Sequence, residues 1–132
     1  WRLHSQVVAG FEGGPGHQGD TTIGAYRGKY RTIDRWDPVV AEIGGAWDAL
    51  LDAGHDIHGA LATSDFHKVG KDRPPCSFSR IHVRVPERMI PGVLKALRAG
   101  SFWSDMGNIL DGLEFSVAFD ELDVPLVPGE IA

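Results

Sequence analysis

A helical pattern between two short apolar runs constrains the fold of this chain more than any other feature. Residues 7–12 and 57–64 are rich in apolar residues and have the length of strands. Between them Asp37 reads as an N-cap and Pro38 as a first helical position, and apolar residues recur at helical spacing up to Gly54. A strand, a helix and a strand in this order predict α/β architecture with at least part of a parallel sheet.

The second half of the chain continues the alternation. In residues 79–85 apolar side chains alternate with Arg80, His82 and Arg84, which predicts a strand with these three side chains on a solvated face. A second amphipathic helix is predicted from Pro86 to a stop at Gly100, after basic residues in its last turns.

The remaining segments are a predicted strand over residues 113–119, an acidic and Pro-rich tail over 120–132, and a Gly-rich polar stretch from Gly13 to Arg35. A polar stretch of this length is typical of a functional loop. The sequence contains no internal repeat, so one domain is expected.

Composition excludes several classes of function. The chain of 132 residues has a formal net charge of −5 and no clustered stripe of Lys and Arg, so sequence-independent nucleic-acid binding is not favoured. Cys76 is the only cysteine, which excludes an internal disulfide framework and a four-cysteine zinc site. No apolar stretch is long enough to span a bilayer. The expected partners are small molecules.

Asp65 and His67 form the strongest candidate site. They follow the apolar run 57–62, and in an extended backbone residues i and i+2 point the same way, so both side chains can reach one ion. An oxygen and a nitrogen ligand suit Zn²⁺, Mn²⁺ or Fe²⁺. The alternative is a helix cap or a hydrogen bond within a loop.

Glu12 and His17 are weaker candidates for the same site. Both lie at or just after the end of the first predicted strand, as Asp65 and His67 follow the second. Sites in α/β folds collect at the carboxyl ends of strands. The alternative is that the glycines between Glu12 and His17 serve backbone shape alone.

Four pieces of sequence together resemble the C-terminal half of a PHP domain, the polymerase and histidinol phosphatase superfamily of metal-dependent phosphoesterases. They are a helix reading W-x-x-L-L-x-x-G (47–54), a strand ending in S-D-x-H (64–67), the alternating strand 79–85, and a helix reading A-L-R-x-G (96–100) followed by an aromatic residue. The resemblance covers roughly residues 36 to 119.

The resemblance implies a fold. Family members are distorted (β/α)7 barrels, so residues 1–119 are expected to be the C-terminal part of such a barrel, and 120–132 a tail or the start of an appended β segment. The family's first-strand His-x-His motif is absent from this sequence. Either the first half of the barrel lies outside the chain, or the chain belongs to a degenerate branch.

The resemblance also implies a chemistry, namely hydrolysis of a small phosphorylated substrate by water bound to two or three divalent ions (Zn, Mn or Fe). Asp65 and His67 match the family's metal ligands, and Glu12 and His17 a looser metal-site segment. His17 is the candidate leaving-group acid if it is not itself a ligand. Candidate phosphate-binding residues are Lys68, Lys71 and Arg73, for which a solvated loop face is the alternative.

Two other functions stay open. One is a metal-dependent hydrolase of amide or glycan-linked bonds on a similar barrel, and the other is a degenerate, non-catalytic interaction module with an exposed apolar surface. Residues 113–119 and 124–130 resemble the start of the appended β segment, whose truncation is expected to expose a strand edge and to make the chain self-associate. With one cysteine and no visible signal, a cytoplasmic location is the default.

Overall fold

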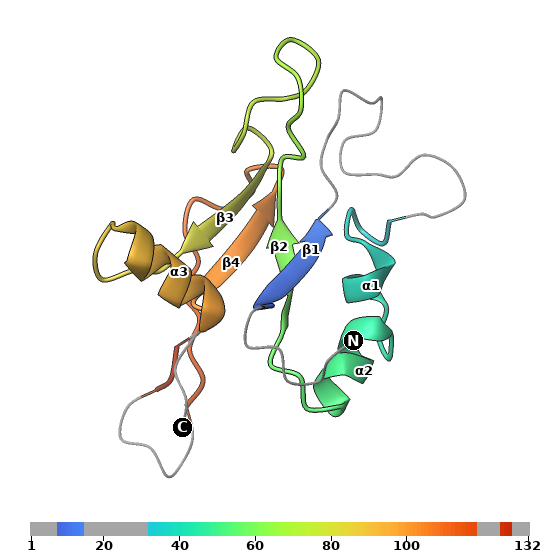
Figure 1. The fold of residues 1–132 in the computed structure, drawn as a ribbon, viewed down its shortest axis with the longest axis vertical. Coiled ribbons are helices and arrows are strands. Elements are labelled where there is room, and N and C mark those ends of the chain that lie inside the picture. Colours follow the sequence, from blue (N-terminus) through green and yellow to red (C-terminus); the bar gives the residue numbers. More distant parts are fainter. Residues whose placement is uncertain (1–7, 15–31, 119–124, 128–132) are drawn as a thin grey trace.

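The computed structural model describes residues 8–14, 32–118 and 125–127 (Figure 1). The elements in chain order are β1 (Gly10–Gly14), α1 (Pro38–Ala41), α2 (Ala46–Asp52), β2 (His58–Ala62), β3 (Ser79–Val83), α3 (Ile90–Arg98) and β4 (Phe102–Met106).

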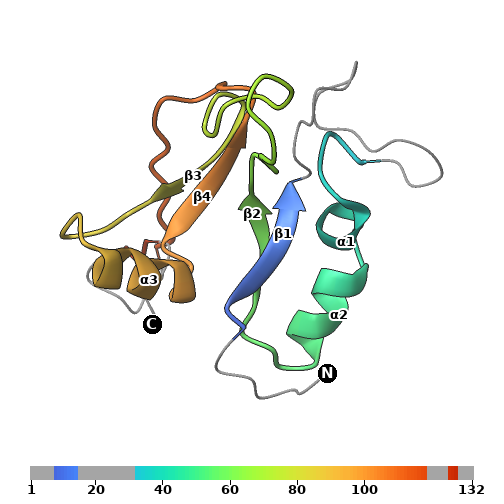
Figure 2. The same cartoon turned by 45° about the horizontal axis from the view of Figure 1, so that its top comes forward.

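The predicted parallel pair is present. Strands β1 and β2 pair in parallel, with Gly10 opposite His58 and Gly14 opposite Ala62, and the register shifts twice between these pairs. Helices α1 and α2 connect them and lie along one side of the pair (Figures 1 and 2). The parallel arrangement brings the carboxyl ends of β1 and β2 to the same edge.

Close packing between α2 and β2 depends on Gly59. A Cβ on this residue would lie 2.7 Å from Trp47 Cδ2 and 2.9 Å from Phe11 Cζ, so no larger side chain fits without a shift. The Trp47 indole N–H also donates to the Ile57 carbonyl at 3.0 Å, which satisfies the polar end of a ring that is otherwise apolar. Helix α2 is thereby fixed against the strand that leads to the candidate site.

The single helix predicted from Pro38 to Gly54 is wrong, because the chain forms two short helices. Its start is confirmed: the Asp37 side chain accepts a hydrogen bond from the Val39 N–H at 2.7 Å. The helix ends where its C-cap residue Glu42 is extended (ψ 115°), and in the turn that follows Gly44 has φ +75° and donates its N–H to Asp48 Oδ2 at 2.6 Å. The interruption lets the chain turn between α1 and α2.

The second half of the described chain is an antiparallel pair with a helix in its connection. Strands β3 and β4 pair from Ser79 opposite Met106 to Val83 opposite Phe102. Sequence reasoning missed β4. It also began α3 too early, at Pro86 instead of Ile90, although the stop at Gly100 (φ +70°) is confirmed.

The two pairs meet between β2 and β4, which run in the same direction (Figure 2). The backbones do not form a ladder there. Instead the Ala62 N–H donates to the Ser104 hydroxyl at 3.2 Å, and Ala62, Phe78 and Met106 pack into a small buried cluster with Trp36 against it. The strands thus lie in the order β1-β2-β4-β3.

No sheet within the described ranges closes on itself, so the barrel stays a prediction. The predicted strand over 113–119 is wrong for its described part: Leu113 and Phe115 are 49% and 60% exposed, and only Val117 forms an isolated bridge, with Leu126. An alternating pattern without a neighbouring strand does not make a ladder. Most of the predicted tail over 120–132 lies outside the described residues.

Among the helices in the described part of the chain, none combines the length and apolar character needed to cross a bilayer.

Candidate functional site

A side-chain hydrogen bond joins β1 to the chain that follows β2. Glu12 lies in the middle of β1 and not at its end as predicted, and Thr63 follows β2 directly. The Thr63 hydroxyl donates a short hydrogen bond to Glu12 Oε1. The Glu12 carboxylate is therefore directed toward the chain that leaves β2, two residues before Asp65. Sequence reasoning named Glu12 but missed Thr63.

Asp65 and His67 come together through a turn and not through an extended strand, which corrects the predicted geometry. Asp65 has φ +49°, a left-handed conformation that ends the extension of β2. The turn brings His67 Nδ1 to 2.8 Å from the Asp65 carbonyl oxygen and 3.4 Å from its Oδ1. Both side chains remain accessible, with His67 68% and Asp65 39% exposed.

The hydrogen bond from His67 fixes the chemistry of its ring. A carbonyl oxygen only accepts, so Nδ1 carries the proton, and in the neutral imidazole the lone pair is then on Nε2. Histidines that bind metals commonly have one nitrogen held in this way by a carbonyl or a carboxylate. The imidazole Nε2 and the Asp65 carboxylate each suit Zn²⁺, Mn²⁺ or Fe²⁺. The carboxylate lies on the Nδ1 side of the ring, so in this conformation the two groups would bind different ions and not the single ion that the sequence predicted.

The described residues supply only part of a ligand set. Within ranges 8–14, 32–118 and 125–127 no three His, Cys, Asp or Glu side chains lie close enough together to hold one ion. His17, the candidate ligand or acid, lies outside the described residues. Asp65 and His67 would thus be two ligands of a larger site.

Asp72 organises the loop that carries His67, a role that sequence reasoning missed. Its Oδ2 accepts hydrogen bonds from the backbone N–H groups of His67 at 2.7 Å and Lys68 at 2.6 Å. These two hydrogen bonds, of which the one from His67 has the larger effect, hold the pKa of the Asp72 carboxyl below its ordinary value of 3.8, because they stabilise the charged form. An acidic residue a few positions after an Asp-x-His motif is the signal that would have indicated it.

The three candidate phosphate-binding residues, Lys68, Lys71 and Arg73, are all exposed. Lys68 and Lys71 lie on this loop, and Arg73 follows it directly. Within the described chain none of their charged groups forms an ion pair. The Lys71 N–H donates to the Lys68 carbonyl at 3.2 Å, so a turn closes between them. Their positive charges lie on the same short segment as Asp65 and His67.

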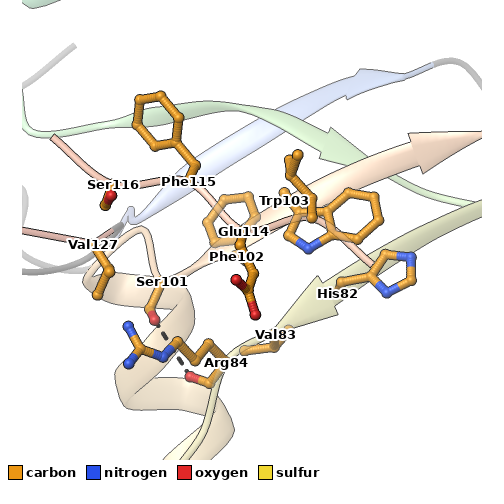
Figure 3. Close-up of a pocket in the computed structure, with 11 residues that line it drawn as sticks. His82, Val83, Arg84, Ser101, Phe102, Trp103, Glu114, Phe115, Ser116 and Val127 are labelled. Atoms are coloured by element: carbon orange, nitrogen blue, oxygen red, sulfur yellow. Dashed lines mark hydrogen bonds between the residues drawn. The ribbon is translucent and has the colours of Figure 1, made fainter. Parts of the chain in front are cut away.

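A separate cavity of about 740 Å³ lies on the β3–β4 pair, near the start of β4 (Figure 3). Its wall includes His82 and Trp103, opposite each other in the register, whose rings stack in parallel at 3.8 Å. The predicted solvated position of His82 is wrong, because the residue is half-buried and its Nε2 is inaccessible to solvent. Because β4 runs in the same direction as β2, the cavity lies at the edge opposite Asp65 and His67.

Comparisons with protein-family models, with curated proteins and with solved structures each found no match to the chain.

Proposed function

We propose that the chain belongs to a metal-dependent hydrolase of phosphate esters, with Asp65 and His67 among the ligands of a di- or trinuclear Zn, Mn or Fe site. The observation that carries the proposal is the His67 Nδ1 hydrogen bond to the Asp65 carbonyl at 2.8 Å, which leaves the Nε2 lone pair for a metal. The metals would lower the pKa of a bound water and neutralise charge on the phosphate oxygens.

Neighbouring residues support the same assignment. Glu12, in the middle of the adjacent parallel strand, accepts a hydrogen bond from Thr63, so a second carboxylate is turned toward the chain that leads from β2 to Asp65. Lys68 and Lys71 put two positive charges on that loop, where they would attract a phosphate. The proposal includes the partial (β/α)7 barrel of the PHP superfamily. Sites in such folds lie at the carboxyl ends of strands, and Asp65 and His67 follow the carboxyl end of β2.

The test compares two pairs of variants. Asp65→Ala and His67→Ala change the carboxyl end of β2, whereas Asp56→Ala and His55→Ala change the same residue types at its amino end. Binding of Zn²⁺ and Mn²⁺ is measured by calorimetry, and hydrolysis of an aryl phosphate is measured in added metal.

Loss of a hydrogen bond that supports a metal ligand lowers metal affinity by roughly 10- to 100-fold. Asp65→Ala and His67→Ala remove ligands themselves, so each is expected to lower metal affinity by more than this. Metal-dependent hydrolysis is expected to disappear together with metal binding. The second pair is expected to match the unmodified chain. Hydrolysis that survives in both Asp65→Ala and His67→Ala would reject the proposal, and a faster rate on an amide than on a phosphate ester would favour the other hydrolase class.

A non-catalytic interaction module is the second candidate. It is favoured by large apolar side chains that the described residues leave uncovered, among them Ile43 at 98%, Ile90 at 77% and Ile109 at 76% exposed. This candidate predicts no stoichiometric metal, so the same calorimetry separates it from the hydrolase.

A further inference from the structure

The loop that carries His67 has little burial to hold its shape. Val69 is 84% exposed, Phe66 is 39% exposed, and the His67 side chain itself is 68% exposed. Apolar packing therefore contributes little to the conformation of residues 65–72. Asp65 nevertheless has φ +49°, which a non-glycine residue adopts only where surrounding interactions favour it. Polar interactions must supply that restraint.

Asp72 ties the backbone of this loop together through both its carboxylate and its N–H. Asp72 Oδ2 accepts from two consecutive N–H groups, those of His67 at 2.7 Å and Lys68 at 2.6 Å. In the other direction the Asp72 N–H donates to the Lys68 carbonyl at 3.0 Å. Hydrogen bonds to a charged carboxylate are shorter and stronger than neutral ones. The His67 N–H is thus bound by Asp72, while its ring is bound by the Asp65 carbonyl.

We infer that Asp72 is a positioning residue of the Asp65 and His67 site, where it holds the His67 backbone so that Nδ1 meets the Asp65 carbonyl and Nε2 is presented to a metal. The inference rests on the proposed function. The role assigned to Asp72 is to hold the loop, because its Oδ2 accepts from two backbone N–H groups of that loop. It acts by reducing the number of orientations that His67 would otherwise sample before binding.

The experiment compares Asp72→Ala and Asp72→Asn with Asp56→Ala in the 132-residue chain. Asp72→Ala removes both hydrogen bonds, and Asp72→Asn keeps an acceptor oxygen of the same shape without the charge. Asp56→Ala removes an exposed carboxylate at the amino end of β2 and so controls for net charge. Affinity for Mn²⁺ is measured by calorimetry, and Co²⁺ absorption reports the ligand geometry.

We expect Asp72→Ala to weaken Mn²⁺ binding by about 10- to 100-fold and to change the Co²⁺ spectrum. Asp72→Asn is expected to restore part of the affinity, whereas Asp56→Ala leaves affinity and spectrum unchanged. If Asp72 served only the general stability of the fold, the circular dichroism spectra of its variants would change together with their Mn²⁺ affinities. A positioning role changes the affinity and leaves the spectrum of the fold as it is. Should the alanine variant fail to fold, the asparagine variant decides.

The two possible failures are distinguishable. Metal binding that depends on His67 but is the same in Asp72→Ala, Asp72→Asn and Asp56→Ala overturns the positioning role alone. Metal binding that is absent, or that His67→Ala leaves intact, overturns the proposed function and the positioning role with it.

Discussion

Asp105 is a buried carboxylate whose charge is balanced by one neighbour. Its side chain is 4% exposed, and Arg80 reaches Oδ2 with Nη2 at 2.8 Å and Nε at 3.0 Å. The Ile109 N–H donates to the other oxygen at 3.4 Å, and Arg80 Nη2 also donates to the Leu110 carbonyl at 3.0 Å. This pair attaches the chain after β4 to β3.

Removing the two partners is expected to have unequal effects on stability. Arg80→Met leaves the Asp105 carboxylate buried and unpaired, at a cost of about 3 kcal/mol in the free energy of unfolding. Asp105→Asn costs less, about 1 kcal/mol, because the Arg80 side chain is 23% exposed and keeps the Leu110 carbonyl. Urea denaturation measures both losses.

Arg84→Met is the control for this experiment. Arg84 is exposed at the end of the same strand, and the described residues give it no ion pair, so its loss is expected to change stability by less than about 0.5 kcal/mol. Equal losses for Arg80→Met and Arg84→Met would contradict a stabilising role for the buried pair.

At the scale of elements, the break between α1 and α2 shows how a local pattern misleads. Apolar residues keep helical spacing from Pro38 to Gly54, yet the first helix ends at Ala41 after one turn, and Gly44 at φ +75° lies in the turn before the second helix. The helical spacing of apolar residues indicates which side chains face the sheet. Two short helices in succession can have this spacing as readily as one long helix.

Gly44→Ala distinguishes the two arrangements by the sign of its effect. With φ +75° the alanine is strained and is expected to destabilise the chain by about 1 kcal/mol or more. In a continuous helix the same change would instead stabilise by about 1 kcal/mol. Thermal and urea denaturation measure the sign, and Gly112→Ala, at an open position without positive φ, is the matched control.

Elements set by local signals were predictable, and elements set by distant partners were not. The Asp37 cap and the Gly100 stop depend on neighbours in sequence and are confirmed. Strand β4 depends on its pairing with β3, about 20 residues away, and was missed. The candidate site divides in the same way. Asp65 and His67 are only two residues apart in the sequence, whereas the contact of Thr63 with Glu12 appears only when β1 and β2 pair.

For the whole molecule, the exposed apolar face of α3 bears on association. Ile90 is 77% exposed, Met89 59% and Leu94 56%, so one side of this helix has little covering it among the described residues. Exposed apolar area of this kind promotes contacts between chains. The self-association predicted from the sequence therefore has a specific surface to test.

We expect sedimentation velocity to show a concentration-dependent increase in mass for the unmodified chain. Ile90→Lys with Leu94→Lys is expected to shift the chain toward monomer, because charge on this face opposes contact between copies. Val69→Lys replaces an equally exposed apolar side chain on a different segment and serves as the control. A single monomeric species at high concentration in all three proteins would contradict this prediction.

The hydroxyl of Ser104 joins two parts of the molecule that are each continuous in the chain. One part runs from β1 through α1 and α2 to β2, and the other from β3 through α3 to β4. Between them lie hydrogen bonds that involve side chains, Ala62 with Ser104 and His58 with Arg98, together with the edge contact of the His58 and Phe102 rings and one small apolar cluster, in place of a cooperative backbone ladder. In terms of folding, each part is a candidate foldon, and amide exchange at Ala62 would report how often the two come apart while each keeps its own strands paired.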